Sequence, residues 1–100
     1  MSYRLTVRSV AEADIAEVAQ WYENERTGLG IEFISEVRRV VHNAKANPFL
    51  YPVISRHPAV HRALTNRFPY RVFYVVRRNM VIVFAVLHVK RSDDAWQQRT

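Results

Sequence analysis

The chain contains no cysteine among its 100 residues. It therefore cannot form a disulfide, a thiolate nucleophile or a cysteine-based metal site, and a reducing compartment, the cytoplasm, is expected. It also lacks an apolar run near the roughly 20 residues that a membrane helix needs, and its first residues lack a signal-peptide core. The length predicts one domain over residues 1–100 that is neither exported nor membrane-spanning.

Acidic residues are scarce in the second half of the chain. The formal net charge is +6, and residues 1–50 carry 6 Lys and Arg against 7 acids, whereas residues 51–100 carry 9 against 2. A basic surface of this kind concentrates anions such as nucleic acid or an acidic protein segment. The alternative is that the arginines only keep a strand-rich half soluble.

Glycine is also rare, and its two copies, Gly28 and Gly30, lie together. On either side, apolar residues recur every three or four positions, which predicts helices over residues 9–26 and 30–46. The glycines let the backbone turn between these helices, so the sequence predicts a helical hairpin.

The ends of the helical hairpin carry their own signals. Ser9 and Glu12 have the spacing of a capping box, which would begin the first helix. Asn47 followed by Pro48 would end the second helix, because proline disfavours the α conformation in the residue before it. Residues 47–59 contain three prolines and are expected to form an ordered loop.

Strands are predicted over residues 3–8, 60–65, 70–77 and 80–89 from alternating or continuous apolar residues, and Arg78-Asn79 suits the tight turn of a hairpin. The resulting order β-α-α-β-β-β predicts an α+β fold. In it, the helical hairpin covers one face of a largely antiparallel sheet.

The last predicted strand is apolar without interruption from Val81 to Leu87, so we expect it to lie centrally and to be buried on both faces. Two helices can cover only one face of the sheet. The other face is therefore expected to form a partly open binding surface, unless residues 49–51 and Trp96 fold over it.

Five segments follow one another along the chain: AEADIAEVAQWYENE, the glycine bend, FISEVRRVVHNAKANPFLYP, FPYRVFYVV and AVLHVKRSDDAWQQR. In this order and spacing they resemble the RelE/ParE superfamily, the toxins of bacterial type II toxin–antitoxin systems. The resemblance implies the same fold, no cofactor, and a cognate antitoxin that neutralises the toxin in a hetero-oligomer. The antitoxin of such a pair typically wraps its toxin with a helix and an extended strand.

One branch of this superfamily consists of enzymes that cleave mRNA on the ribosome. Similarity to these RelE-like toxins places a catalytic arginine at Arg71 and further catalytic residues at His88 and Arg91. The chemistry needs a proton acceptor, a proton donor and cations around the phosphate. The C-terminal aromatic, often a tyrosine in RNA-cleaving members, is Trp96 here, and an indole is not a useful acid or base.

The other branch inhibits DNA gyrase and stabilises its cleaved complex without chemistry of its own. The long helical hairpin, the FPY element and the LH followed by arginine resemble these ParE-like toxins more closely, so gyrase is the expected target. A third reading is a non-toxic module that only pairs with an antitoxin or with itself. Residues expected to contact the target or the antitoxin are Arg62, Lys90, Arg91, Trp96 and Arg99.

Several of these residues also have a structural interpretation. His88 ends an apolar strand, where a histidine is often a hydrogen-bonded structural residue. Arg71 interrupts an apolar run and must reach solvent, an acid or a ligand, because a buried unpaired charge is costly. His61 and Arg62 are adjacent on a strand and point to opposite faces, so only one of them, by expectation Arg62, can join Arg71.

The remaining aromatic and histidine residues are read as structural. Trp21 and Tyr22 are expected to pack against the second helix, and Tyr70 and Tyr74 are expected in the core. His57 and His61 would have metal-ligand spacing only on a helix. Pro58 between them argues against a helix, so no metal is predicted.

Overall fold

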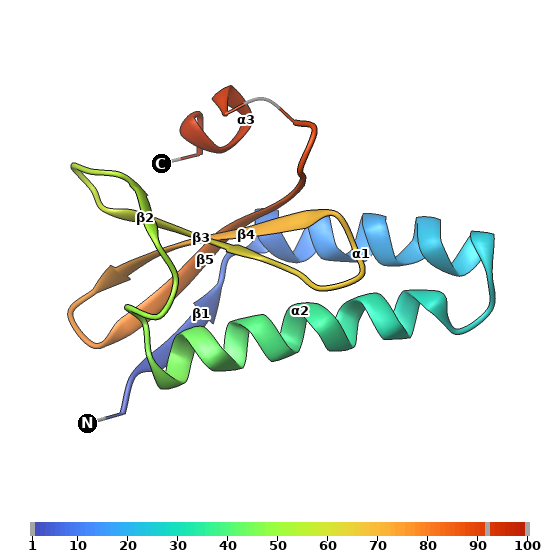
Figure 1. Cartoon of the computed structure of the whole chain (residues 1–100), viewed down its shortest axis with the longest axis horizontal. Helices are drawn as coiled ribbons and strands as arrows, with labels where there is room; N and C mark the ends of the chain where they lie inside the picture. The colour runs from blue at the N-terminus through green and yellow to red at the C-terminus, as the bar shows by residue number, and fades with distance from the viewer. Residues whose placement is uncertain (1, 92, 100) are drawn as a thin grey trace.

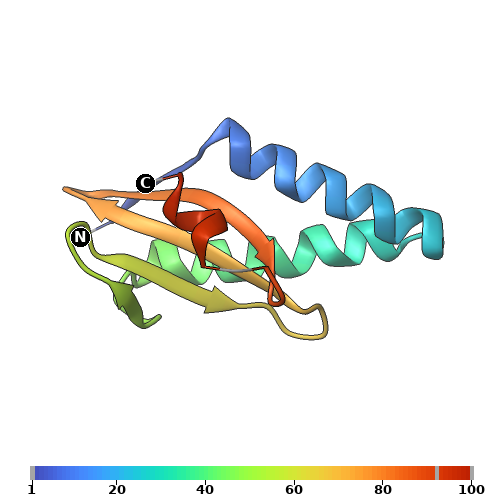
Figure 2. The same cartoon turned by 90° about the horizontal axis from the view of Figure 1, so that it is seen from above.

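The computed structural model of the chain describes residues 2–91 and 93–99 (Figure 1). Its two long helices lie side by side against one face of a sheet, and a short C-terminal helix lies over the opposite face (Figures 1 and 2). The elements are β1 (Arg4–Val7), α1 (Ser9–Glu25), α2 (Leu29–Ala46), β2 (Val53–Ser55), β3 (Val60–Leu64), β4 (Tyr70–Arg77), β5 (Met80–His88) and α3 (Asp94–Gln97). The predicted α+β class is confirmed.

The sheet is mixed, with strand order β1-β5-β4-β3-β2. β1 pairs with β5 in parallel, and the other three pairings are antiparallel. β5 therefore lies between β1 and β4, and its residues from Val83 to Leu87 are buried, which confirms the central strand. The prediction of a loop over residues 47–59 is partly wrong. Within this range β2 adds a three-residue strand to the edge of the sheet.

The capping box predicted for α1 is wrong. Arg8 occupies the N-cap position and makes no side-chain cap hydrogen bond, and Ser9 is already inside the helix. The backbone N–H groups of Ala11 and Glu12 donate to the Arg8 carbonyl at 2.9 Å each. The entry into α1 is therefore fixed by the backbone alone.

The glycine bend closes the helical hairpin as predicted, and both glycines are needed there. Gly28 has a φ of 90°, which L side chains rarely adopt. A Cβ at Gly30 would lie 2.5 Å from the carbonyl oxygen of Ala19, so α1 and α2 approach too closely for a side chain. The Glu23 carboxylate accepts hydrogen bonds from the backbone N–H of Gly28 (2.9 Å) and of Gly30 (3.1 Å), which fastens the bend.

An aromatic cluster joins the helical hairpin to the sheet. The fully buried ring of Phe33 lies 5.6 Å from Tyr22, 5.4 Å from Phe68 and 5.2 Å from Tyr70, between ring centroids. Tyr22 thus packs against α2 as predicted. The same prediction is wrong for Trp21, which stays 58% exposed and has its ring contact with its neighbour Tyr22.

The second face of the sheet is closed over its centre by the chain itself, which corrects the expectation of a partly open surface. The buried ring of Trp96 stacks on Phe73 at 5.7 Å, and Phe84 is buried in the same cluster. Phe49 and Leu50 do not take part and remain 66% and 55% exposed. The short helix α3, which carried no helical signal of its own, therefore serves as the cover.

Tyr74 is fully buried, and its hydroxyl donates to the Pro48 carbonyl at 2.7 Å. Burial raises the pKa of the Tyr74 phenol to about 12. Above the unfolded-state pKa of about 10, the unfolded chain loses this proton while the folded protein keeps it. We expect stability to be unaffected by this group below pH 10 and to fall by up to about 2.7 kcal/mol as the pH rises to 12.

Urea denaturation of the protein and of Tyr74→Phe across this pH range measures that effect, since the other tyrosines are common to both proteins. At neutral pH the variant should be less stable by about 0.5–1.5 kcal/mol, because it lacks the hydrogen bond. Towards pH 12 the order should reverse. Parallel stability curves would contradict the assignment.

Candidate functional site

The candidate catalytic residues lie where β4 and β5 meet, and the strand register separates them. Arg71 is opposite Leu87, and Tyr70 is opposite His88. Residues directly opposite one another share a face of the sheet, so His88 joins Tyr70 on the helix-covered face, whereas Arg71 is on the other face. The ring centroids of Tyr70 and His88 are 5.2 Å apart. The side chains of Arg71 and His88 therefore point to opposite sides of the sheet.

A β-bulge produces this separation. The register of the β4–β5 pair shifts by one residue between Phe73 and Tyr74. In a regular hairpin continuing the Arg77–Met80 pair, Arg71 would be opposite Val86 and on the same face as His88. The bulge places Phe84 and Ala85 together in the second-face cluster and reverses the faces beyond it.

Arg71 is buried and held by several groups. Its guanidinium donates to the carbonyl oxygens of Arg91 (2.8 Å) and His88 (3.4 Å) and lies 3.7 Å from the Asp93 carboxylate. The guanidinium carbon is 5.3 Å from the centre of the Phe73 ring. These contacts fasten the segment after β5 onto the second face, which is the structural interpretation of this arginine.

His88 is also held by the backbone. Its Nδ1 accepts a hydrogen bond from the Lys90 backbone N–H at 3.0 Å, an arrangement of the neutral imidazole. The side chains of Lys90 and Arg91 are exposed. They place two cations side by side at the end of β5.

Arg62 and His61 are adjacent on β3 and lie on opposite faces of the sheet. Arg62 is opposite Phe73 and thus shares a face with Arg71, whereas His61 stacks on Tyr74 at 4.8 Å on the helix side and donates from Nδ1 to the Tyr51 carbonyl. The prediction that Arg62 rather than His61 faces the same way as Arg71 is confirmed.

Arg99 anchors the C-terminal helix. Its guanidinium makes a two-fold ion pair with Asp14 of α1, at 2.6 and 3.1 Å, and this hydrogen bond raises the pKa of Arg99. The Asp14 carboxylate also accepts the Val86 backbone N–H at 2.9 Å. Nothing in the sequence signalled the pairing of residues 85 positions apart. Together with buried Trp96, it fixes α3 against the sheet.

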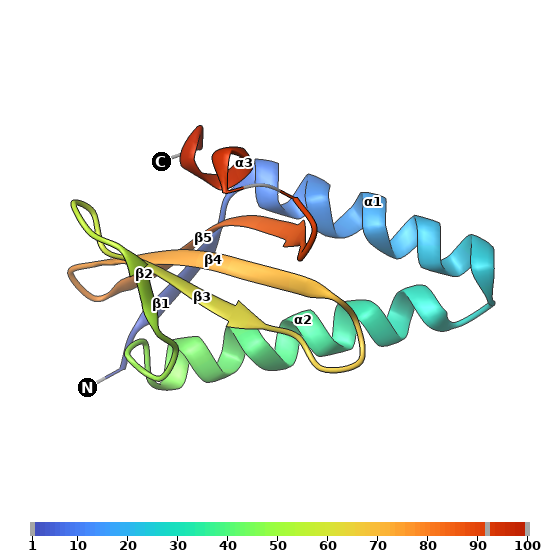
Figure 3. The same ribbon diagram turned by 45° about the horizontal axis from the view of Figure 1, so that its top comes forward.

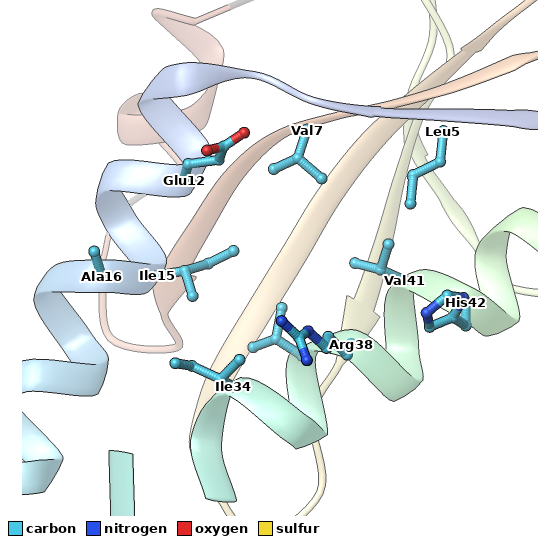
Figure 4. Close-up of a pocket in the computed structure, with 10 residues that line it drawn as sticks. Leu5, Val7, Glu12, Ile15, Ala16, Ile34, Arg38, Val41 and His42 are labelled. Carbon is cyan, nitrogen blue, oxygen red and sulfur yellow. The ribbon is translucent and has the colours of Figure 1, made fainter. Parts of the chain in front are cut away.

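An apolar groove of about 460 Å³ opens between β1 and the helical hairpin (Figure 4). Leu5 and Val7 of β1 point toward side chains of α1 and α2, including Ile15 and Ile34, and Arg38 lies along the margin (Figure 4). β1 pairs only with β5, so among the described strands its outer edge is unpaired. Sequence reasoning counted these apolar residues toward the core and did not foresee a groove.

Within residues 2–91 and 93–99, no group of three histidine or carboxylate side chains is arranged to hold a metal ion. No helix in the same part of the chain is both long enough and apolar enough to cross a bilayer. Two features of the described residues are candidates for function, namely the exposed basic end of β5 and the apolar groove.

Comparison with known proteins places this architecture among the toxins of type II toxin–antitoxin systems. The sequence model of the family described as "ParE toxin of type II toxin-antitoxin system, parDE" matches residues 5–93. The chain therefore belongs to the ParE toxin family, and membership implies a cognate antitoxin.

A solved structure supports the fold. The "Chromosomal ParDE TA system from P. aeruginosa" includes a chain that superimposes with a TM-score of 0.65 at 15% sequence identity, covering 87% of this chain and 96% of that one. No curated protein matches the chain.

Proposed function

We propose that this toxin acts in the cytoplasm by inhibiting DNA gyrase, without chemistry of its own. The observation that carries the proposal is the placement of Arg71 and His88 on opposite faces of the sheet. An RNA-cleaving site would need an acid or base and a cation around one phosphate. Arg71 instead holds backbone carbonyls of its own chain.

Lys90, Arg91 and Arg62 are proposed to contact the target, whereas Trp96 and Arg99 act indirectly by holding α3 in place. The two exposed cations at the end of β5 suit an anionic partner, and gyrase engaged with DNA presents phosphates. The contacts are electrostatic, so inhibition should weaken with added salt.

The direct test combines two assays of the purified toxin. We expect inhibition of gyrase supercoiling with accumulation of cleaved DNA, while a reconstituted translation reaction continues and its mRNA stays intact. Cleavage of mRNA on the ribosome with gyrase unaffected would overturn the proposal in favour of the RelE-like alternative. Activity in neither assay would favour the non-toxic module.

Removing both exposed cations tests the proposed contact surface. The double variant Lys90→Ala, Arg91→Ala should weaken gyrase inhibition by about tenfold and leave the melting temperature unchanged, because exposed charges add little to stability. The matched control is Arg4→Ala, Lys45→Ala, which removes two exposed cations elsewhere and should inhibit normally. Equal loss in both double variants would mean that only net charge matters.

The apolar groove beside β1 is proposed to receive the antitoxin. The unpaired edge of β1 can accept an extended strand, and the groove can accept apolar side chains of the same segment. Ile34→Glu would place a charge in the groove, and we expect it to lower antitoxin affinity by about 100-fold while gyrase inhibition persists.

Calorimetric titration of the purified toxin with its antitoxin measures this loss. The control is Ile31→Glu, on the same helix but 69% exposed and outside the groove. Circular dichroism checks that both variants fold. Unchanged affinity of a folded Ile34→Glu variant would assign the antitoxin to another surface.

A further inference from the structure

A second cleft, of about 710 Å³, lies between the C-terminal half of α1, the start of β4 and the end of β5. Figure 3 shows the arrowhead of β5 ending beside α1. Its walls include Glu17, Trp21 and Tyr22 from α1 together with Tyr70 and His88 from the strands. This aromatic cleft shares none of its lining residues with the groove beside β1.

The rings of the aromatic cleft meet edge to face. Trp21 lies 5.1 Å from Tyr22 at 79°, Tyr22 lies 6.3 Å from Tyr70 at 73°, and Tyr70 lies 5.2 Å from His88 at 81°. Successive rings therefore present their π faces in different directions around one space. The indole of Trp21 contacts the edge of Tyr22 but stays mostly exposed, so it offers a large apolar surface to a ligand.

The charge of the aromatic cleft is opposite to that of the protein. Among the described residues that line it, none is Lys or Arg, although the net charge of the chain is +6, and the one acidic side chain is that of Glu17. Burial, followed by electrostatic interaction with Tyr22 and then with Glu17, raises the pKa of Tyr70. The His88 ring accepts the Lys90 backbone N–H at its Nδ1.

A polar acceptor completes the aromatic cleft. The Gln20 amide donates from Nε2 to Asn24 Oδ1 at 3.0 Å, and this bond does not use its Oε1, an acceptor on a residue that lines the cleft. Rings that offer π faces, one carboxylate and one amide oxygen suit a planar group with several N–H donors and a positive charge.

We propose that the aromatic cleft binds the guanidinium group of an arginine presented by a protein partner. A guanidinium stacks on aromatic faces and can donate two hydrogen bonds to a carboxylate such as Glu17. An apolar side chain would make no use of the Glu17 carboxylate, and a phosphate would be repelled by it. The site is independent of the gyrase proposal, because it follows from this geometry alone.

The test uses Nα-acetylarginine amide as the probe and follows the Trp21 indole signal by NMR, assigned with Trp21→Phe. We expect a saturable shift with a dissociation constant on the order of 10 mM, typical of one stacked and paired group. The citrulline analogue has the same shape without the charge and should bind about fivefold more weakly or worse. Adenosine monophosphate should not compete.

Variants of two of the acidic residues on α1 complete the test. Glu17→Gln should weaken probe binding by about fivefold. Glu25→Gln, an exposed acid on the same helix outside the cleft, should leave it unchanged. No saturable shift with the arginine probe, equal binding of citrulline, tighter binding of the nucleotide, or an unaffected Glu17→Gln variant would each overturn the proposal.

Discussion

Replacement of Phe33 by alanine is expected to lower the free energy of unfolding by about 3–5 kcal/mol, the largest effect of a single substitution that we foresee. Phe33 is fully buried and lies against three aromatic rings, which belong to α1, the turn before β4, and β4 itself. Truncation leaves a cavity that rigid rings cannot fill. Urea denaturation followed by circular dichroism measures the loss.

Ile31→Ala is the matched control, because Ile31 lies two residues away on α2 and is exposed. Its effect should stay within about 0.5 kcal/mol. A loss of less than about 2 kcal/mol for Phe33→Ala would mean that the surrounding rings move into the cavity. The packing between the helical hairpin and the sheet would then be more deformable than the structure indicates.

The Phe33 cluster also links stability to binding. Tyr22 and Tyr70 contact Phe33 with one side of their rings and line the aromatic cleft with another. A destabilised cluster would therefore disorder the cleft before the whole chain unfolds. Probe binding should weaken in Phe33→Ala even at temperatures where the variant remains folded.

The helices could be predicted closely because their signals are local. The expected range 9–26 corresponds to α1, Ser9–Glu25, and the expected range 30–46 corresponds to α2, Leu29–Ala46. Periodic apolar residues, two glycines and an Asn-Pro step act within a few positions. The same local reasoning failed for the capping box. Ser9 is the first residue of α1, and Arg8 occupies the N-cap position that was expected for Ser9.

Elements that depend on distant partners could not be predicted. β2 has three residues and exists only as an edge against β3, and α3 has four residues held by Trp96 on Phe73 and by Arg99 on Asp14. Neither is long enough to show a period. The parallel pairing of β1 with β5 likewise joins the two ends of the chain.

The arrangement of the candidate site also depends on contacts that the sequence does not reveal. The faces of His61 and Arg62 followed from strand alternation, but the faces of Arg71 and His88 depend on one bulge in the β4–β5 pair. A shift of one residue moves a side chain from one face to the other. The resemblance to RNA-cleaving toxins identified Arg71 and His88 as candidates. Only the register of the β4–β5 pair shows that their side chains lie on opposite faces of the sheet.

Substitution of Arg71 by methionine is expected to cost about 2–4 kcal/mol of stability, because it removes a buried guanidinium that donates to two backbone carbonyl groups. Methionine keeps an unbranched aliphatic side chain at this position, so the loss reports the guanidinium, including its contact with the Phe73 ring. Hydrogen exchange should accelerate most in Lys90, Arg91 and Trp96, where the held segment and α3 lie.

Arg77→Met is the control, since Arg77 lies on the same strand with an exposed side chain, and its stability should change by no more than about 0.5 kcal/mol. The two roles of Arg71 predict opposite patterns. A structural arginine gives a less stable variant whose gyrase inhibition falls in proportion to the loss of folded protein. A catalytic arginine gives a variant of normal stability that no longer cleaves mRNA, and that result would restore Arg71 to an active site on the second face of the sheet.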